Sequence, residues 1–142
     1  MLLATGLLTV GLPANAYAAS YTALDLGTLP GGSYSYAYGI NGSGQVVGDA
    51  DTASGQQHAF LWSSGSGMTD LGTLPNGYGS EAFCINSSGQ VVGGAGPGPT
   101  QAILWNSGGK MINLNSLITD ANAAAQINWT SPRCTPLAAA YC

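Results

Sequence analysis

The chain carries very little charge. Only 6% of its 142 residues are charged, and two cations, Lys110 and Arg133, stand against six acids to give a net charge of −4. A typical globular domain carries about 25% charged residues. Without a basic patch, the chain has nothing to attract the phosphates of nucleic acid or an anionic membrane surface. We therefore expect neither of these as a partner.

Residue types that bind metals or catalyse reactions are also scarce. The single histidine, His58, lacks the partners of a catalytic triad or a metal site. We interpret it as a residue at a strand start whose ring hydrogen-bonds a neighbouring strand or loop. Cys84 is interpreted as a small buried apolar residue, while Cys134 and Cys142 could pair in an oxidising compartment. No catalytic residue, cofactor or metal is expected.

The N-terminus has the features of an export signal. Residues 2–12 are apolar, Pro13 ends the run, and Ala16-Tyr17-Ala18 fits the small-x-small cleavage pattern, although no Lys or Arg precedes the run. A hydrophobic first strand and a membrane anchor are the alternatives, but a spanning helix needs about 20 apolar residues. We predict a signal peptide over 1–19 and an extracellular or cell-surface protein with no membrane attachment after cleavage.

The most informative feature is an internal repeat. Asp25-Leu-Gly-Thr-Leu-Pro30 returns unchanged at 70–75, which is 45 residues later. The ten residues from Gly39 return from Cys84 with two changes, again 45 residues later. His58-Ala-Phe-Leu-Trp62 returns as Gln101-Ala-Ile-Leu-Trp105, now 43 residues later. A period of this length indicates one supersecondary unit that is used repeatedly.

Each unit contains four short runs of strand-like alternation, separated by turns rich in Gly, Ser and Asn. The predicted strands are 36–41, 45–51, 58–63 and 68–74 in the first unit, and 81–86, 90–95, 101–106 and 110–115 in the second. We expect Asn before Gly or Ser to supply the positive φ of the hairpins. The third strand is apolar on both faces, which predicts sheets packed on both sides of it.

The predicted fold class is all-β, with antiparallel four-stranded repeats that match two blades of an incomplete β-propeller. The predicted segments are a signal peptide (1–19), a leading strand of a preceding repeat (20–30), repeat 1 (31–75), repeat 2 (76–118) and an atypical tail (119–142). A propeller closes with about four to eight blades. A fragment of a longer protein, assembly between chains and an open stack of two sheets are therefore considered. The fragment is favoured because the tail loses the repeat rhythm, as after a truncation or frameshift.

Three linked motifs, which occur twice in the same order, resemble the HAF family of extracellular repeats. They are Gly39-Ile-Asn-x-x-Gly-Gln-Val-Val-Gly48, the name-giving His58-Ala59-Phe60, and Met68-x-Asp-Leu-Gly-Thr-Leu-Pro75. The resemblance covers about residues 23–129. It implies a bacterial, exported, propeller-like protein and carries over no catalytic residue. Gln101 and Ile103 replace His and Phe in the second unit, so the repeat does not require the histidine.

Three tyrosines are the candidate ligand-binding residues. Tyr34, Tyr36 and Tyr38 alternate along the first predicted strand, so we expect them on one face. Aromatic faces suit carbohydrate or peptide surfaces. The second unit has no such ladder, which makes these tyrosines a better candidate for a surface than the repeated tryptophans. The alternative, that they form a core between neighbouring sheets, stays open. Trp62 and Trp105, which are repeated, are interpreted as core residues.

Acidic side chains are given structural roles. Asp25 and Asp70 precede the repeated Leu-Gly-Thr-Leu, with Asn113 in the same place of the second unit. We expect all three side chains to cap backbone N–H groups. Residues 49–55 only faintly resemble a calcium loop, because Ala53 occupies a ligand position, and a solvated hairpin is favoured.

The sequence thus predicts an exported module that binds extracellular partners, either a surface polysaccharide or a protein, and has no catalytic activity. One alternative is a fragment of a propeller enzyme that acts on polysaccharide, to which Asp49, Asp51, Glu81 and His58 could contribute. The other alternative is a structural surface repeat that self-associates through open sheet edges.

Overall fold

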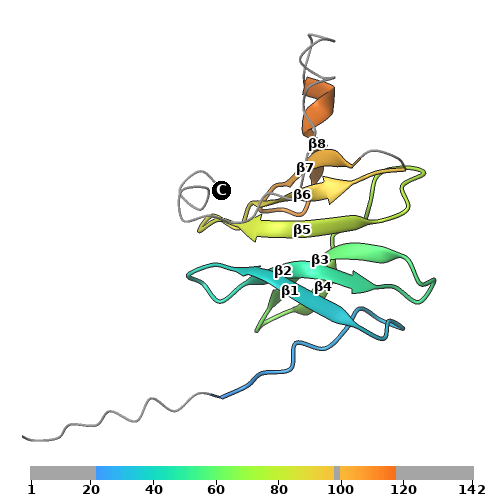
Figure 1. The fold of residues 1–142 in the computed structure, drawn as a ribbon. Coiled ribbons are helices and arrows are strands. Elements are labelled where there is room, and N and C mark those ends of the chain that lie inside the picture. Colours follow the sequence, from blue (N-terminus) through green and yellow to red (C-terminus); the bar gives the residue numbers. More distant parts are fainter. Residues whose placement is uncertain (1–21, 98–99, 118–142) are drawn as a thin grey trace, which may run out of the picture.

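A computed structural model describes residues 22–97 and 100–117, which form two antiparallel four-stranded sheets stacked face to face (Figure 1). The strands of each sheet neighbour one another in chain order. A 3-10 helix, η1 (Leu114–Leu117), follows the last strand. The first sheet contains β1 (Ser35–Ile40), β2 (Val46–Asp51), β3 (Gln57–Ser63) and β4 (Gly67–Asp70), and the second contains β5 (Ser80–Ile85), β6 (Val91–Ala95), β7 (Gln101–Trp105) and β8 (Met111–Asn113).

The eight predicted strands form, and the all-β fold class is confirmed. The two sheets do not close into a ring or barrel within the described ranges. β4 and β8 end earlier than the sequence predicted, at Asp70 and Asn113. Each of these side chains accepts a hydrogen bond from the backbone N–H two residues later, at 2.7 and 3.0 Å, and turns the chain out of the sheet. Asp25 makes the same bond at 2.9 Å, so the expected capping role is confirmed at all three positions.

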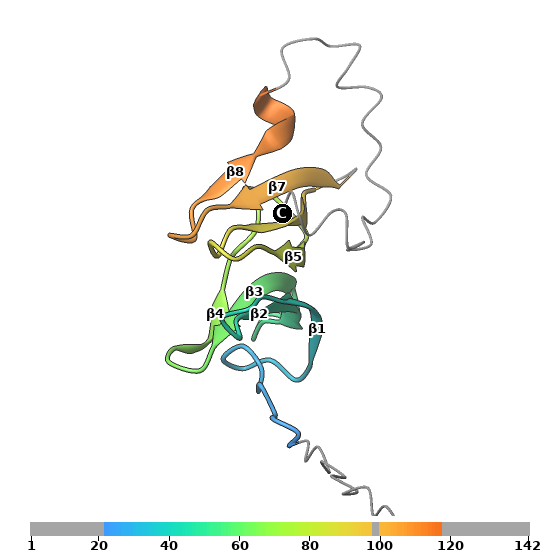
Figure 2. The ribbon, with the colours of Figure 1, turned by 90° about the vertical axis from the view of Figure 1, so that its left-hand side faces the viewer.

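The strand predicted over residues 20–30 is wrong for its described part, residues 22–30, which contain no strand. This segment instead runs beneath the first sheet, which lies between it and the second sheet (Figure 2). Leu26 and Leu29 pack there with Phe60 and Trp62. Burial of these leucines replaces strand pairing as the force that holds the segment in place.

The main core lies between the two sheets. Val47 and Ala59 of the first sheet are fully buried in it, with Leu61 packed against them. The second sheet contributes Ala82, Ile85, Val91, Ala95, Ile103 and Trp105. Phe60 is fully buried on the opposite face of β3 from Ala59. Both faces of β3 are therefore covered, as its apolar sequence predicted.

Both sheets have the same β-bulge in their first strand. The pairing register shifts between Ala37 and Gly39 in β1, and between Ala82 and Cys84 in β5. Tyr38 and Phe83 are therefore the extra residues of the two bulges. A bulge bends its strand and re-aims the side chain at the extra position.

The bulges explain two of the repeated glycines. A Cβ at Gly48 would lie 1.8 Å from the Tyr36 carbonyl oxygen, and one at Gly93 would lie 1.9 Å from that of Glu81. No side chain fits at such distances, so the close approach of the bulged strand requires glycine in both sheets.

The hairpin turns rely on asparagine side chains. The expectation that asparagine supplies the positive φ of these hairpins is wrong. The residues with positive φ in the turns are Gly44 (75°) and Gly89 (77°). Asn41 Oδ1 instead accepts hydrogen bonds from the N–H groups of Ser43 and Gln45, at 3.1 and 3.0 Å. The same bonds recur in the turns that begin at residues 86 and 106. The side chain thus fixes the loop and glycine closes it.

Within the described ranges no helix has the length and apolar character that crossing a membrane requires. The predicted signal peptide, the atypical tail, Cys134 and Cys142 lie outside the described residues.

Candidate functional site

Tyr34, Tyr36 and Tyr38, which we call the tyrosine surface, lie in and just before β1. Their relative exposures are 39%, 58% and 49%. The single ladder expected from alternation does not form. The rings of Tyr34 and Tyr36 lie 5.5 Å apart between centroids, whereas Tyr38 lies at the bulge and packs 6.3 Å from Phe83 of the second sheet. Tyr38 therefore has part of the inter-sheet role that was the alternative, while Tyr34 and Tyr36 form an exposed pair.

A buried carboxylate lies close to this surface. Asp49 of β2 is fully buried, and neither of its carboxylate oxygens has a hydrogen-bond partner. Burial and then Asp49 raise the pKa of Tyr38 well above its usual range, although no bond of normal geometry joins the two side chains. A carboxylate in such surroundings lowers the stability of the fold, because no hydrogen bond replaces the water that it loses on burial. The second repeat has Gly94 at this position, so the fold does not require the acid.

Glu81 of β5 approaches Asp49 from the other sheet. Burial, and next the Asp49 carboxylate, raise the pKa of Glu81, while a 3.4 Å hydrogen bond from Gln57 Nε2 lowers it. Glu81 also lines a pocket of about 220 Å³ together with Gln57, Tyr78 and Thr100. Two acids that the repeat does not share thus interact where the two sheets meet.

Asp51 serves as a cap. Its Oδ1 accepts hydrogen bonds from the N–H groups of Ser33 (2.7 Å) and Tyr34 (2.8 Å), and its Oδ2 accepts one from Ser33 Oγ (2.8 Å). The bond from the Tyr34 N–H is the main cause of the lowered pKa of Asp51. Asp51 therefore fixes the backbone that presents Tyr34.

No metal-binding group of three or more His, Cys, Asp or Glu side chains occurs in the part of the chain that the structure describes. The segment considered as a faint calcium loop contains the β2–β3 hairpin. It is closed by backbone bonds between Thr52 and Gln56 (2.8 Å) and between Gly55 and Thr52 (2.8 Å). Asp51 directs its oxygens to Ser33 and Tyr34 rather than to this loop.

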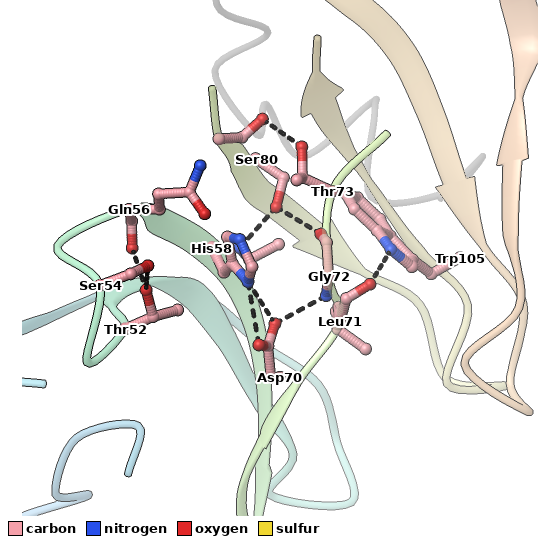
Figure 3. A network of polar contacts seen from close by, with 12 residues as sticks. Thr52, Ser54, Gln56, His58, Asp70, Leu71, Gly72, Thr73, Ser80 and Trp105 are labelled. Carbon is pink, nitrogen blue, oxygen red and sulfur yellow. Dashed lines mark hydrogen bonds and ion pairs between the residues drawn. The ribbon is translucent and has the colours of Figure 1, made fainter. Parts of the chain in front are cut away.

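His58 is paired with Asp70 of the neighbouring strand (Figure 3). Its Nδ1 lies 3.0 and 2.9 Å from the two carboxylate oxygens, which confirms the interpretation made from the sequence. In the second sheet the counterparts Gln101 and Asn113 are also hydrogen-bonded to each other. The pair is therefore a feature of the repeat, made by an imidazole and a carboxyl group in one sheet and by two amides in the other.

Ser80 lies near this pair but does not complete a catalytic triad. Its hydroxyl donates to the Gly72 carbonyl (2.6 Å) and accepts from the Ala59 N–H (2.8 Å), and the residue is 3% exposed. His58 Nε2 is buried without a partner. A serine nucleophile would need its hydroxyl proton directed to a base and would need access to substrate. Ser80 instead joins the sheets.

Cys84 is 5% exposed, as expected for a buried residue. It is also disulfide-bonded. The interpretation as a purely apolar packing residue is therefore wrong.

Comparisons of the chain with protein-family models, with curated proteins and with solved structures found no match. Sequence reasoning named Asp49 in the faint calcium loop and, together with Glu81, in the enzyme alternative. It missed Gln57, Tyr78 and Thr100. Alignment of the two repeats offers the signal, because it sets Asp49 against Gly94 and Glu81 against Tyr36.

Proposed function

We propose that the chain is an exported, non-catalytic binding module that holds an extracellular polysaccharide on the tyrosine surface. The observation that carries this proposal is the exposure of Tyr34, Tyr36 and Tyr38. The second repeat forms the same sheet with Gly79, Glu81 and Phe83 in their places. Because folding does not require the tyrosines, their exposed rings are available to stack on the faces of sugars.

Polar groups beside the tyrosines favour a sugar ligand. Glu81, whose charge contributes to the raised pKa of Tyr38, lines a pocket with Gln57 and Tyr78, and these three side chains can exchange hydrogen bonds with sugar hydroxyls. The chain's net charge of −4 and the carboxylates near the site disfavour an anionic polymer. We therefore propose a neutral polysaccharide, with a protein as the alternative partner.

We further propose that the two sheets are blades of an incomplete β-propeller and that the chain is an exported member of the HAF-type repeats. Two four-stranded antiparallel sheets, stacked and ordered along the chain, support the blade interpretation. The proposal of a module without catalysis is supported by the structural roles of two of the acid–base candidates. Asp51 caps a loop, and His58 forms a pair that recurs without charge in the second sheet.

Binding of neutral glycans, measured on a glycan array and then by calorimetry, tests this proposal. The wild-type chain should bind at least one neutral polysaccharide, and Tyr36→Ala should weaken that binding by about fivefold, since stacking on one aromatic ring contributes about 1 kcal/mol. Leu117→Ala is the control, because Leu117 is an exposed apolar residue on η1. Absence of glycan binding, or equal binding by Tyr36→Ala, would contradict the proposal. Capture of a protein that depends on Tyr36 would support the alternative partner.

A further inference from the structure

The pocket beside Glu81 lies where the two sheets meet. It has a volume of about 220 Å³ and is formed at the starts of β3 and β5 and at the end of β6. Gln57 comes from β3 and Glu81 from β5, while Tyr78 and Thr100 precede β5 and β7. Pockets for drug-sized ligands begin at roughly 300 Å³, so this pocket suits a smaller group such as one sugar unit.

The backbone of the pocket wall is largely engaged in hydrogen bonds of its own. The Tyr78 N–H donates to the Gly96 carbonyl at 3.3 Å, and the Gly96 N–H donates to the Gly79 carbonyl at 3.3 Å. The Gly79 carbonyl also accepts a hydrogen bond from Thr73 Oγ1 at 2.7 Å. A ligand in the pocket would therefore be held chiefly by side chains.

The polar side chains of the pocket are rich in acceptors. The ionised Glu81 carboxylate accepts hydrogen bonds through both oxygens and donates none. Gln57 directs its Nε2 to Glu81 Oε1 at 3.4 Å, so the amide oxygen is its acceptor for a ligand. Thr100 adds a hydroxyl, which can also accept. An ammonium group has three donors and no acceptor, and it therefore complements this set better than a sugar hydroxyl does.

Negative charge near the pocket has no counter-charge. Asp49 alternates along β2 with Val47 of the inter-sheet core, so its side chain faces the second sheet. It is fully buried without a hydrogen-bond partner, and after burial it is the next cause of the raised pKa of Glu81. Among the described residues the ion pair joins His58 to Asp70, and neither Asp49 nor Glu81 has a basic partner. A cation bound at Glu81 would offset the charge of both acids.

An exposed aromatic ring lines the same pocket. Tyr78 is 77% exposed. The face of such a ring attracts a cation and also stacks on a sugar ring. The first repeat has Ser33 in the place of Tyr78 and Tyr36 in the place of Glu81. The shared fold therefore requires neither the ring nor the acid of this pocket.

We propose that this pocket binds a protonated amino sugar, with its ammonium group at Glu81 and its ring against Tyr78. The inference rests on the proposed function, because the amino sugar would be one unit of the bound polysaccharide, whose other units are uncharged. The ammonium group donates hydrogen bonds to the Glu81 carboxylate and to the oxygens of Gln57 and Thr100. A uniformly neutral sugar would leave the charge of the two acids without a counter-charge.

Titration of the full chain with glucosamine, glucose and N-acetylglucosamine at neutral pH tests the inference, with binding followed through the NMR signals of the backbone amides. Glucosamine should shift the amide signals of pocket residues such as Tyr78, Gly79 and Gly96. It should bind at least about fivefold more tightly than either neutral sugar, because a hydrogen bond between charged groups is roughly twice as strong as a neutral one. This preference should shrink as salt is added.

Variants of the pocket test the role of the charge. Glu81→Gln keeps the size of the side chain and removes its charge, so it should abolish the preference for glucosamine over glucose. Asp25→Asn is the matched control, because it removes one charge from an exposed side chain outside the pocket. Tyr78→Ala should weaken glucosamine binding by about threefold. Circular dichroism checks the fold, and if Glu81→Gln does not fold, the exposed Tyr78 decides.

Equal binding of glucosamine and glucose by the wild type would overturn the inference, as would an unchanged preference in Glu81→Gln or a lost preference in Asp25→Asn. The failure of this inference can be distinguished from that of the proposed function. Glycan binding that depends on Tyr36, without a preference for glucosamine at the pocket, would refute this inference alone. A preference for glucosamine at the pocket, without glycan binding that depends on Tyr36, would refute the tyrosine surface as the polysaccharide site.

Discussion

The two sheets share their strand order, bulge and hairpin turns, yet they lie in different surroundings. Trp105 is fully buried and its indole N–H donates to the Leu71 carbonyl at 2.9 Å, whereas Trp62 is half-buried. Likewise, Ile85 of the second sheet is buried, whereas Ile40 of the first sheet is exposed. The repeated sequence therefore encodes a sheet with two apolar faces, and the neighbour of each face determines how completely it is buried.

The sheets also differ in polarity, and these differences gather where β1 and β5 meet. Asp49 stands against Gly94, and Glu81 stands against Tyr36. These residues are not required for the shared fold, because at each position the other sheet forms with a different residue. A buried, unpartnered carboxylate beside exposed tyrosines lowers the stability of the fold. Losses of stability of this kind are common at functional sites.

The largest expected effect on stability comes from replacing the glycine that both sheets need beside the bulge. Gly48→Ala and Gly93→Ala should each destabilise the fold by about 3 kcal/mol or more, because a Cβ would lie within 2 Å of a backbone oxygen. Urea unfolding of both variants checks this. Gly42→Ala and Gly65→Ala are controls, since their Cβ atoms would meet nothing within 4 Å, and they should change stability by less than about 1 kcal/mol. A large loss of stability at only one of the two glycines would show that the two bulges are not equivalent.

The next largest effect on stability should come from the difference in burial between matching isoleucines of the two sheets. Ile85→Ala should cost about 3 kcal/mol because it leaves a cavity between the sheets. Ile40→Ala should cost less than about 0.5 kcal/mol in the monomer, because that side chain is largely exposed. Both variants are compared by urea unfolding at a low protein concentration. Equal losses of stability would show that Ile40 is packed as completely as Ile85.

Removing the buried acid Asp49 should stabilise the fold rather than destabilise it. Asp49→Ala makes the first sheet more like the second and should stabilise the fold by about 1 kcal/mol, since an unpartnered buried carboxylate is lost. Thermal and urea unfolding measure the change. A loss of stability instead would mean that the carboxylate has a favourable partner, and Tyr38→Phe would then show whether the Tyr38 hydroxyl is that partner.

A smaller effect depends on pH. The pKa of Asp51 is lowered from 3.8, chiefly by the hydrogen bond from the Tyr34 N–H. Its ionised form therefore stabilises the fold fully above pH 3.8, and this contribution is lost as the pH falls through the lower pKa of the folded state. Wild type should be more stable than Asp51→Asn at neutral pH, and the gap should narrow on acidification. A gap that stays constant across the acid range would contradict this role.

Local sequence signals were sufficient for the strands and for the capping side chains. Alternation between turn residues placed all eight strands, and the repeat of Asp25 at Asp70 indicated a shared turn. Signals that depend on distant residues were missed. The segment before β1 was predicted as a strand because it ends in the same Asp-Leu-Gly-Thr-Leu-Pro motif as the fourth strand of the first repeat, but its leucines are buried by packing beneath the sheet. The bulge at Tyr38 likewise depends on the approach of β2.

The candidate site was predicted only in part. The sequence identified the tyrosines, and the structure places them on the surface, but their binding role stays a prediction. The neighbourhood of Asp49 and Glu81 could not be derived from spacing, because the two residues lie on different sheets. The stacking of the sheets brings them close enough for Asp49 to raise the pKa of Glu81.

Hydrogen exchange in β1 and β5 tests the central claim most directly, because the two strands have the same pairing and differ in what covers them. We predict that β1 amides exchange faster than those of β5 in dilute protein. Equal protection of the two strands in dilute protein would contradict the account.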